Sequence, residues 1–240
     1  MRLDQYLVFK KYFISRHQAH EHIITGGVLV NGEPCIKSSY AVKENDVITA
    51  NKQRFVSRAG HKLEAVLQHW KISLQGKSVL DIGSSTGGFV DCALQYGARR
   101  VYAVDVGIHQ LSTKLKNDSR VVSIEHTDIR EYKTVERFDV ITVDVSFISL
   151  EKIIPELGRF IVDNGSCILL IKPQFEVGKE NIGKGGLVKD KKMLAYAQQK
   201  VTEMMIRYHF IPQGPCIISP LKGGEGQIEY LGYYCLDKSA

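Results

Sequence analysis

A glycine-rich loop bordered by acidic residues is the feature of this sequence best suited to ligand binding. The apolar segment 78–82 contains Asp81 and runs directly into Gly83, and the glycine pair Gly87-Gly88 follows four residues later. Glycines at such a turn let the backbone approach a ligand that larger side chains would keep away. A further apolar segment ends at Asp105, roughly 20 residues on, where a carboxylate can accept hydrogen bonds from a ribose diol. These residues predict a nucleoside-containing ligand.

Two classes of nucleoside ligand use such a loop, and the loop sequence separates them. A dinucleotide site requires Gly-x-Gly-x-x-Gly, so that a pyrophosphate can rest on the helix N-terminus, but Ser85 stands where the second glycine belongs. Asp81 would repel a pyrophosphate and suits an amino group or a sulfonium. The pattern Asp-x-Gly-x-x-x-Gly-Gly resembles motif I of S-adenosylmethionine-dependent methyltransferases; a glycine turn without a ligand is the alternative.

This resemblance implies a set of cofactor-binding residues at the ends of the first four strands. Asp128 and Ile129 follow the third strand, where such enzymes bind the adenine amino group, although Asp128 alone would more often be a helix cap. The implied set is Asp81, Gly83, Ser84, Thr86, Gly87, Gly88, Phe89, Asp105, Val106, Asp128, Ile129 and Asp144.

Two charged residues follow neighbouring predicted strands beyond this loop. Asp144 begins Asp-Val-Ser-Phe, at the position where amino-group methyltransferases of this fold often carry an acidic or polar residue followed by two prolines. Because the prolines are absent, methylation of a base amine is disfavoured. The next strand ends at Lys172, which places a lysine beside Asp144 at the ligand-binding edge of the sheet.

Strands alternate with helices from about residue 77, which predicts a mostly parallel sheet covered on both faces. The expected strands are 78–82, 100–104, 121–125, 138–143, 166–171, one near Ile217, and 229–236. The expected helices are 88–96, 109–117, 150–161 and 190–208. The fold class is therefore α/β, a Rossmann-like domain with a seven-stranded sheet, preceded by a small α+β module.

The preceding module carries most of the basic excess of the chain. Residues 1–60 contain nine Lys/Arg against five Asp/Glu, a net +4 out of +6 for the whole sequence. Two short helices and the strand 28–30, which enters an Asn-Gly turn, resemble the RNA-binding module of small-subunit ribosomal protein four. We expect boundaries of 1–51 for this module, 52–58 for a linker and 59–240 for the catalytic domain. The predicted RNA-binding residues are Arg2, Lys10, Lys11, Arg16, His17, Lys37 and Arg58.

Composition excludes several other classes of protein. The five cysteines are dispersed, so neither a zinc half-site nor a disulfide framework is expected, and the chain carries no metal in this interpretation. Asp4, Lys10 and Lys11 interrupt any secretory signal, and no apolar run approaches the length of a membrane span. The prediction is a cytoplasmic protein without a membrane partner; the sequence does not indicate its oligomeric state.

Motifs along nearly the whole chain resemble the hemolysin A (TlyA) family of ribosomal-RNA 2′-O-methyltransferases. They are Arg54–Leu63, the glycine loop, Asp144–Leu150, Ile171–Glu176 and Gln227–Tyr230. The catalytic half is similar to the heat-shock 23S ribosomal-RNA 2′-O-methyltransferases, whose signature is a Lys-Asp-Lys-Glu tetrad. By motif, this resemblance implies the catalytic residues Lys62, Asp144, Lys172 and Glu229, although Glu225 lies close to the last of them. It also implies S-adenosyl-L-methionine as cofactor, cytidines of 16S or 23S RNA as substrate, and ribosomal RNA or subunits as partner.

The implied residue types suit a ribose hydroxyl, which must lose its proton as its oxygen attacks a methyl group. A lysine can accept that proton only in its neutral form, which burial, a second lysine and a nearby sulfonium favour. The hypothesis is that Lys172 accepts the proton or holds the hydroxyl, Asp144 and Glu229 orient the lysine, and Lys62 positions the ribose or phosphate. The alternatives are an inactive RNA-binding assembly factor, a base methyltransferase and a membrane-active haemolysin.

Overall fold

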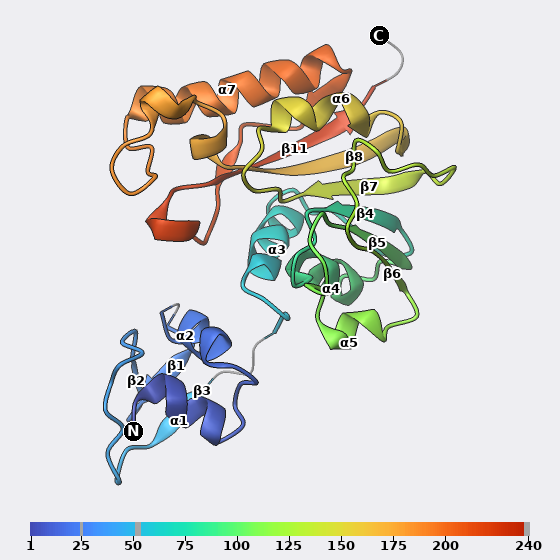
Figure 1. Cartoon of the computed structure of the whole chain (residues 1–240). Helices are drawn as coiled ribbons and strands as arrows, with labels where there is room; N and C mark the ends of the chain where they lie inside the picture. Colours follow the sequence, from blue (N-terminus) through green and yellow to red (C-terminus); the bar gives the residue numbers. More distant parts are fainter. Residues whose placement is uncertain (25, 51–53, 238–240) are drawn as a thin grey trace. The chain divides into compact units, whose positions relative to one another are not determined.

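The computed structural model describes residues 1–24, 26–50 and 54–237, in two compact units, Met1–Arg58 and Ala59–Ala240. Figure 1 shows their elements along the chain. Of the expected linker 52–58, residues 52 and 53 lie outside the described part. Each unit has its own apolar core.

The first unit is a helix pair on a small antiparallel sheet. Helices α1 (Leu3–Phe9) and α2 (Arg16–Ile24) pack beside strands β1 (Val28–Val30), β2 (Glu33–Pro34) and β3 (Ile48–Ala50), in the order β2-β1-β3. The predicted Asn-Gly turn joins β1 to β2, and both of its residues have positive φ, 54° and 86°. Leu3, Leu7, Ile23 and Val28 are fully buried at the centre.

The second unit is a twisted sheet between two layers of helices. Strands β4 (Ser78–Ile82), β5 (Arg100–Val104), β6 (Val121–Ile124), β7 (Phe138–Val143) and β8 (Ile161–Ile171) are parallel, whereas β9 (Phe210–Pro212), β10 (Ile217–Ile218) and β11 (Tyr230–Leu236) pair antiparallel. The order is β10-β11-β8-β7-β4-β5-β6, with β9 beside β11. All seven expected strands are present, and β9 is an additional eighth.

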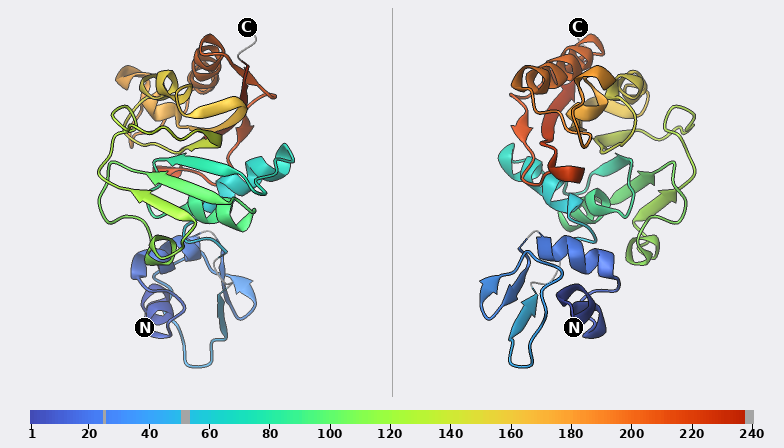
Figure 2. Two further views of the ribbon diagram at one scale, coloured as in Figure 1. Left: turned by 90° about the vertical axis from the view of Figure 1, so that its right-hand side faces the viewer. Right: turned by 60° about the vertical axis from the view of Figure 1, so that its left-hand side comes forward.

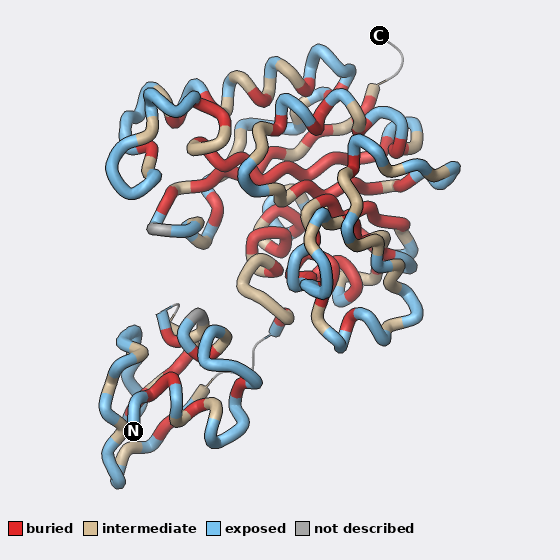
Figure 3. Tube along the Cα trace, in the orientation of Figure 1, coloured by how far each residue is buried: buried red, intermediate tan, exposed pale blue. Residues whose placement is uncertain are grey.

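Helices cover both faces of this sheet, as Figures 1 and 2 show. Helices α3 (Ala59–His69) and α4 (Gly88–Gln95) lie against one face, and α6 (Ile154–Leu157) and α7 (Lys191–Arg207) against the other. The buried residues concentrate along the central strands and the inner sides of these helices (Figure 3). The sheet reverses its order at β4, which has β5 on one side and β7 on the other, and ligands of such sheets bind at that point.

Two of the expected helices differ from prediction for local reasons. The expected helix 150–161 is a 3₁₀ turn, η1 (Leu150–Lys152), then the four-residue α6, because Pro155 has no N–H to continue an α-helical ladder. Ile161 already belongs to β8, which begins earlier than the expected 166. The expected helix 109–117 is confined to α5 (Thr113–Lys116), since His109 has a positive φ of 57° and is non-helical.

Candidate active site

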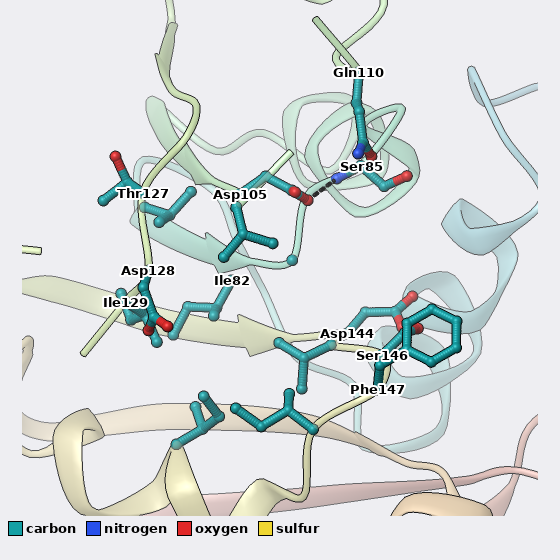
Figure 4. A pocket seen from close by; sticks show the side chains of 16 residues that line it. Ile82, Ser85, Asp105, Gln110, Thr127, Asp128, Ile129, Asp144, Ser146 and Phe147 are labelled. Carbon is teal, nitrogen blue, oxygen red and sulfur yellow. Dashed lines mark hydrogen bonds between the residues drawn. The ribbon is translucent and has the colours of Figure 1, made fainter. Parts of the chain in front are cut away.

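A pocket lies at the carboxyl ends of β4, β5 and β7, where the sheet order reverses. Its volume is about 340 Å³, within the range of small-ligand sites. Figure 4 shows Asp105 and Asp144 just after the ends of separate strands and Asp128 on the loop that follows a third. The expected cofactor residues that line it are Gly83, Asp105, Val106, Asp128, Ile129 and Asp144. The expected residues that do not line it are Asp81, Ser84, Thr86, Gly87, Gly88 and Phe89.

The first glycine of the loop is required by a close backbone approach. Gly83 has φ +83°, and a Cβ built there would lie 2.5 Å from the carbonyl oxygen of Asp144. Gly87, with φ +95°, precedes the first turn of α4, and a Cβ there would collide with the side chain of Leu115. The two glycines therefore let the β4–α4 loop pack tightly, against the residue that follows β7 at Gly83 and against α5 at Gly87.

Asp105 is held in place by the loop opposite it. Its Oδ2 accepts a hydrogen bond from the Ser85 N–H at 2.7 Å, and its Oδ1 accepts one from the Gly107 N–H at 2.7 Å. Figure 4 shows the Asp105 carboxylate reaching across to Ser85. Each oxygen keeps a further lone pair, so the carboxylate can still accept from hydroxyl groups of a ligand in the pocket.

Asp128 lines the pocket but already has a partner. Its carboxylate accepts from the Arg130 guanidinium, at 2.6 Å for the shortest contact, and this hydrogen bond lowers the pKa of Asp128. Arg159 donates from one Nη2 to three carbonyl oxygens of the following turn, those of Ile129, Arg130 and Tyr132. Asp128 is therefore ionised and rigidly placed. An amino group of a ligand would donate to the same carboxylate that already accepts from Arg130.

Asp81 is buried beneath the loop and does not face the pocket. Alternation along β4 turns Ile82 toward the pocket and Asp81 toward the opposite face. The Thr142 hydroxyl donates to Oδ1 at 2.6 Å, whereas Oδ2 has no hydrogen-bond partner within the described residues. Burial raises the pKa of Asp81 to about 7, and the charges of Asp144 and Asp105 add to that effect. The expected direct contact with a cation is not supported by this placement.

Lys172 and Asp144 form an ion pair at the edge of the pocket. Lys172 Nζ lies 2.7 Å from Asp144 Oδ1 and donates to Ser146 Oγ at 2.7 Å. The lysine is 9 % exposed, and both of its partners line the pocket. The adjacent parallel strands β7 and β8 produce this contact, because Asp144 and Lys172 are the residues that follow them.

Lys62 and Glu229 form a second ion pair, which joins α3 to the residue before β11. Lys62 Nζ donates to Glu229 Oε2 at 2.6 Å, and the two residues are 7 % and 3 % exposed. The antiparallel ladder pairs Tyr230 with Ile171, so the next position places Glu229 level with Lys172. The four residues implied by the resemblance thus form two adjacent pairs. The side chain of Glu225 lies outside the described residues.

Three residues near these pairs were not among the predicted site residues. Ser146 holds Lys172, and Glu176 is buried at 4 % exposure behind it. Phe147 is 92 % exposed at the pocket rim, with φ +64° and its ring 5.5 Å from that of Phe175. Ser146 and Phe147 belong to the Asp-Val-Ser-Phe motif noted in the sequence, which was the available signal. Glu176 is the last residue of the Ile171–Glu176 motif, but no role was predicted for it.

The predicted RNA-binding residues of the first unit lie at its surface, but two of them form ion pairs with a buried aspartate. Arg2 and Arg16 both donate to Asp4, with shortest contacts of 3.0 and 2.8 Å. Burial raises the pKa of Asp4, but the two guanidinium groups outweigh it and hold that pKa at about 2. Lys10, Lys11, His17 and Lys37 are exposed, and Arg58 is half-buried.

Neither a metal cluster nor a membrane helix is found where the structure is described. In the ranges 1–24, 26–50 and 54–237 no group of three or more His, Cys, Asp or Glu residues could hold a metal ion. Over the same residues, every helix is too short or too polar to span a bilayer.

A reversed-order sheet with a pocket at its switch point occurs in several nucleotide-binding folds, and solved methyltransferases share the fold of this unit. A NodS N-methyltransferase from Bradyrhizobium japonicum, solved with S-adenosylhomocysteine, matches the fold at a TM-score of 0.51 and 16% identity, covering 73% of this chain and 87% of that one. The FtsJ-like methyltransferase model matches residues 55–235, and the S4 domain model matches residues 1–48.

Relatives that match nearly the whole chain narrow this class. Hemolysin A of Brachyspira hyodysenteriae is 40% identical, over 98% of this chain and 100% of that protein. The 16S/23S rRNA (cytidine-2′-O)-methyltransferase TlyA of Mycobacterium tuberculosis is 38% identical, over 95% and 87%. A solved structure from Streptococcus thermophilus has a TM-score of 0.78 at 38% identity, covering 99% of this chain and 89% of that one. The chain belongs to the FtsJ-like methyltransferase family and, within it, to the hemolysin A (TlyA) family, as its motifs predicted.

Proposed function

We propose that this protein transfers a methyl group from S-adenosylmethionine to the ribose 2′-hydroxyl of cytidines in ribosomal RNA. The observation that carries the proposal is the Lys172–Asp144 pair, whose Asp144 and Ser146 also line the pocket. This arrangement puts a candidate proton acceptor where a ligand and a hydroxyl could meet. The rRNA (cytidine-2′-O)-methyltransferase name of the Mycobacterium tuberculosis relative supports the choice of substrate.

The residues present fit S-adenosylmethionine. Gly83 lines the pocket without a side chain, the carboxylate of Asp105 is oriented for a ribose diol, and Asp128 with Ile129 would border the adenine. When bound, the cofactor supplies an electrophilic methyl group. Asp144 lines this pocket and also forms the ion pair with Lys172, so one carboxylate can contact the cofactor and orient the lysine.

The polar side chains would then act on the hydroxyl. Lys172 accepts its proton or holds it by a hydrogen bond, while Asp144 and Ser146 fix the lysine in one rotamer. Lys62, anchored by Glu229, is the second cation of the set and suits a neighbouring ribose or phosphate oxygen. The exposed ring of Phe147 offers an unstacked base a flat face at the rim.

The division between modules 1–51 and 59–240 forms part of the same proposal. The S4-type module would supply phosphate contacts and affinity, and the second unit the chemistry. Exposed Lys10, Lys11 and Lys37 support this division, since Arg2 and Arg16 already share Asp4.

The test is direct identification of the methylated nucleoside. Purified protein would be incubated with methyl-labelled S-adenosylmethionine and separate 30S or 50S subunits, and the RNA digested to nucleosides for mass spectrometry. We expect label in 2′-O-methylcytidine, lost in Lys172→Ala and kept in Lys133→Ala, an exposed lysine elsewhere. Label in a base-methylated nucleoside, or in neither subunit, would refute the proposed substrate. Asp105→Ala should weaken cofactor binding by calorimetry, without RNA.

A further inference from the structure

Lys172 and its two partners are held by segments that extend past the end of the sheet. The parallel ladder between β7 and β8 ends at Val143 and Leu169. Asp144 and Ser146 lie on the loop after β7, and Lys172 begins the segment after β8. Because ladder hydrogen bonds stop before these residues, contacts outside the ladder contribute to the spacing between the two segments.

The side chain of Glu176 provides one such contact. Its Oε2 accepts from the Ser149 hydroxyl at 2.6 Å, and its Oε1 accepts from the Leu150 N–H at 2.9 Å. Ser149 and Leu150 end the loop that carries Asp144. Glu176 itself closes a 3₁₀ turn, η2 (Pro173–Phe175), in which Phe175 N–H donates to the Lys172 carbonyl at 2.9 Å. One carboxylate thus joins the two catalytic segments.

The buried carboxylate of Glu176 carries a desolvation cost that a residue needed only for packing would not have. The Glu176 side chain is 1 % exposed, and burial raises its pKa, partly offset by its hydrogen bonds to Ser149 and Leu150. Lys200 of α7 lies 3.8 Å from the carboxylate and donates to the Glu176 carbonyl at 3.2 Å. An apolar side chain would fill the same space without a desolvation cost. Glu176 does not line the pocket, so it has no direct contact with a ligand there.

We propose that Glu176 is a positioning residue, which sets the geometry of Lys172 against Asp144 and Ser146 by tying the loop after β7 to the segment after β8. This rests on the proposed function, since it assigns Glu176 to the transfer step. It acts through the backbone of both segments. Its removal should therefore lower turnover while leaving the cofactor pocket formed.

The kinetic test compares four variants of the full chain. Glu176→Ala should lower kcat by roughly 10–100-fold, because a displacement of about 1 Å can cost about 100-fold, with the KM for ribosomal subunits and the cofactor Kd within about threefold. Glu176→Gln should recover most of the activity, since its amide oxygen can accept from Leu150 and its NH₂ can donate to the Ser149 hydroxyl. Ser149→Ala should give a smaller loss that adds little to Glu176→Ala. Glu151→Gln is the matched control, a 55 % exposed carboxylate on the same Lys200.

A second measurement does not depend on methyl transfer. Hydrogen exchange of the Leu150 amide should be about tenfold or more faster in Glu176→Ala than in wild type, because the amide no longer has its charged acceptor. In Glu151→Gln it should be unchanged. Wild-type protein that transfers no methyl group would refute the proposed function. The exchange rate of the Leu150 amide would still show whether Glu176 joins the two segments. Wild-type transfer with equal kcat in Glu176→Ala and Glu151→Gln would refute the positioning role alone, as would a loss of kcat matched by an equal loss of cofactor affinity.

Discussion

Asp81 should make the stability of the catalytic unit fall as pH rises from about 4 to about 7, and then level off. Its pKa is about 7 in the folded protein against an ordinary value of 3.8. The folded state therefore holds a proton that the unfolded state has lost, and the free energy of unfolding decreases across this window. At 1.36 kcal/mol for each pH unit, the full penalty above pH 7 is about 4 kcal/mol, of which about 3 kcal/mol develops between pH 5 and pH 8.

Asp81→Asn removes this titration while its amide oxygen can still accept from Thr142. Urea unfolding at pH 5 and pH 8, followed by the fluorescence of Trp70, the single tryptophan, reports on the second unit. Between these pH values the wild type should lose about 3 kcal/mol more than Asp81→Asn. The comparison cancels any constant cost of the new amide.

Asp139→Asn is the matched control for this experiment. Burial raises the pKa of Asp139, but hydrogen bonds from the Ser78 N–H and hydroxyl, at 2.8 and 2.9 Å, outweigh it and lower that pKa. Its stabilising contribution is thus lost only as pH falls below about 4, and the substitution should leave the slope between pH 5 and 8 unchanged. A wild-type slope equal to that of Asp81→Asn would show that Asp81 titrates normally and would refute the reasoning.

Other predictions concern the two ion pairs and the basic module. Lys172→Ala should lower kcat by about 100–10,000-fold with cofactor Kd nearly unchanged, and Lys172→Arg should not restore it, because a guanidinium stays protonated; lost cofactor binding by calorimetry would indicate a structural role instead. Glu229→Gln should destabilise the second unit by about 3 kcal/mol in urea unfolding, since it leaves the buried ammonium of Lys62 without a counter-charge; an unchanged midpoint would contradict this. Replacing Lys10 and Lys11 by Ser should reduce the slope of log K for subunit binding against log salt, by roughly 0.7 for each phosphate that the module no longer neutralises, and an unchanged slope would exclude phosphate binding by these two lysines.

Apolar periodicity was sufficient to locate the sheet. The bounds of β4, β5 and β7 agree with prediction because most of their residues are buried and apolar. The expected helix 150–161 is divided because Pro155, which lacks an N–H, can stand in the first turn of α6 but cannot continue an α-helical ladder from η1, although the apolar spacing runs through it. β9 was missed because three residues, ending in a proline, give too short a pattern.

The candidate site was predictable where topology alone determines it. Asp105 and Asp144 reach the pocket because they follow strands adjacent to β4. The orientation of Asp81 was not predictable, since a strand buried on both faces gives no alternation to show which side chain faces the ligand. The tie made by Glu176 depends on a loop conformation that no local pattern encodes.

The ion pair between Lys62 and Glu229 has a consequence for synthesis of the protein, because its partners lie 167 positions apart. At 5–20 residues per second, Glu229 is polymerised about 10–30 s after Lys62. During that interval the S4-type module is already complete, whereas the last carboxylate of the proposed catalytic set does not yet exist. A nascent chain could therefore hold RNA before it can modify it. Only chains whose synthesis has passed β11 would then transfer a methyl group.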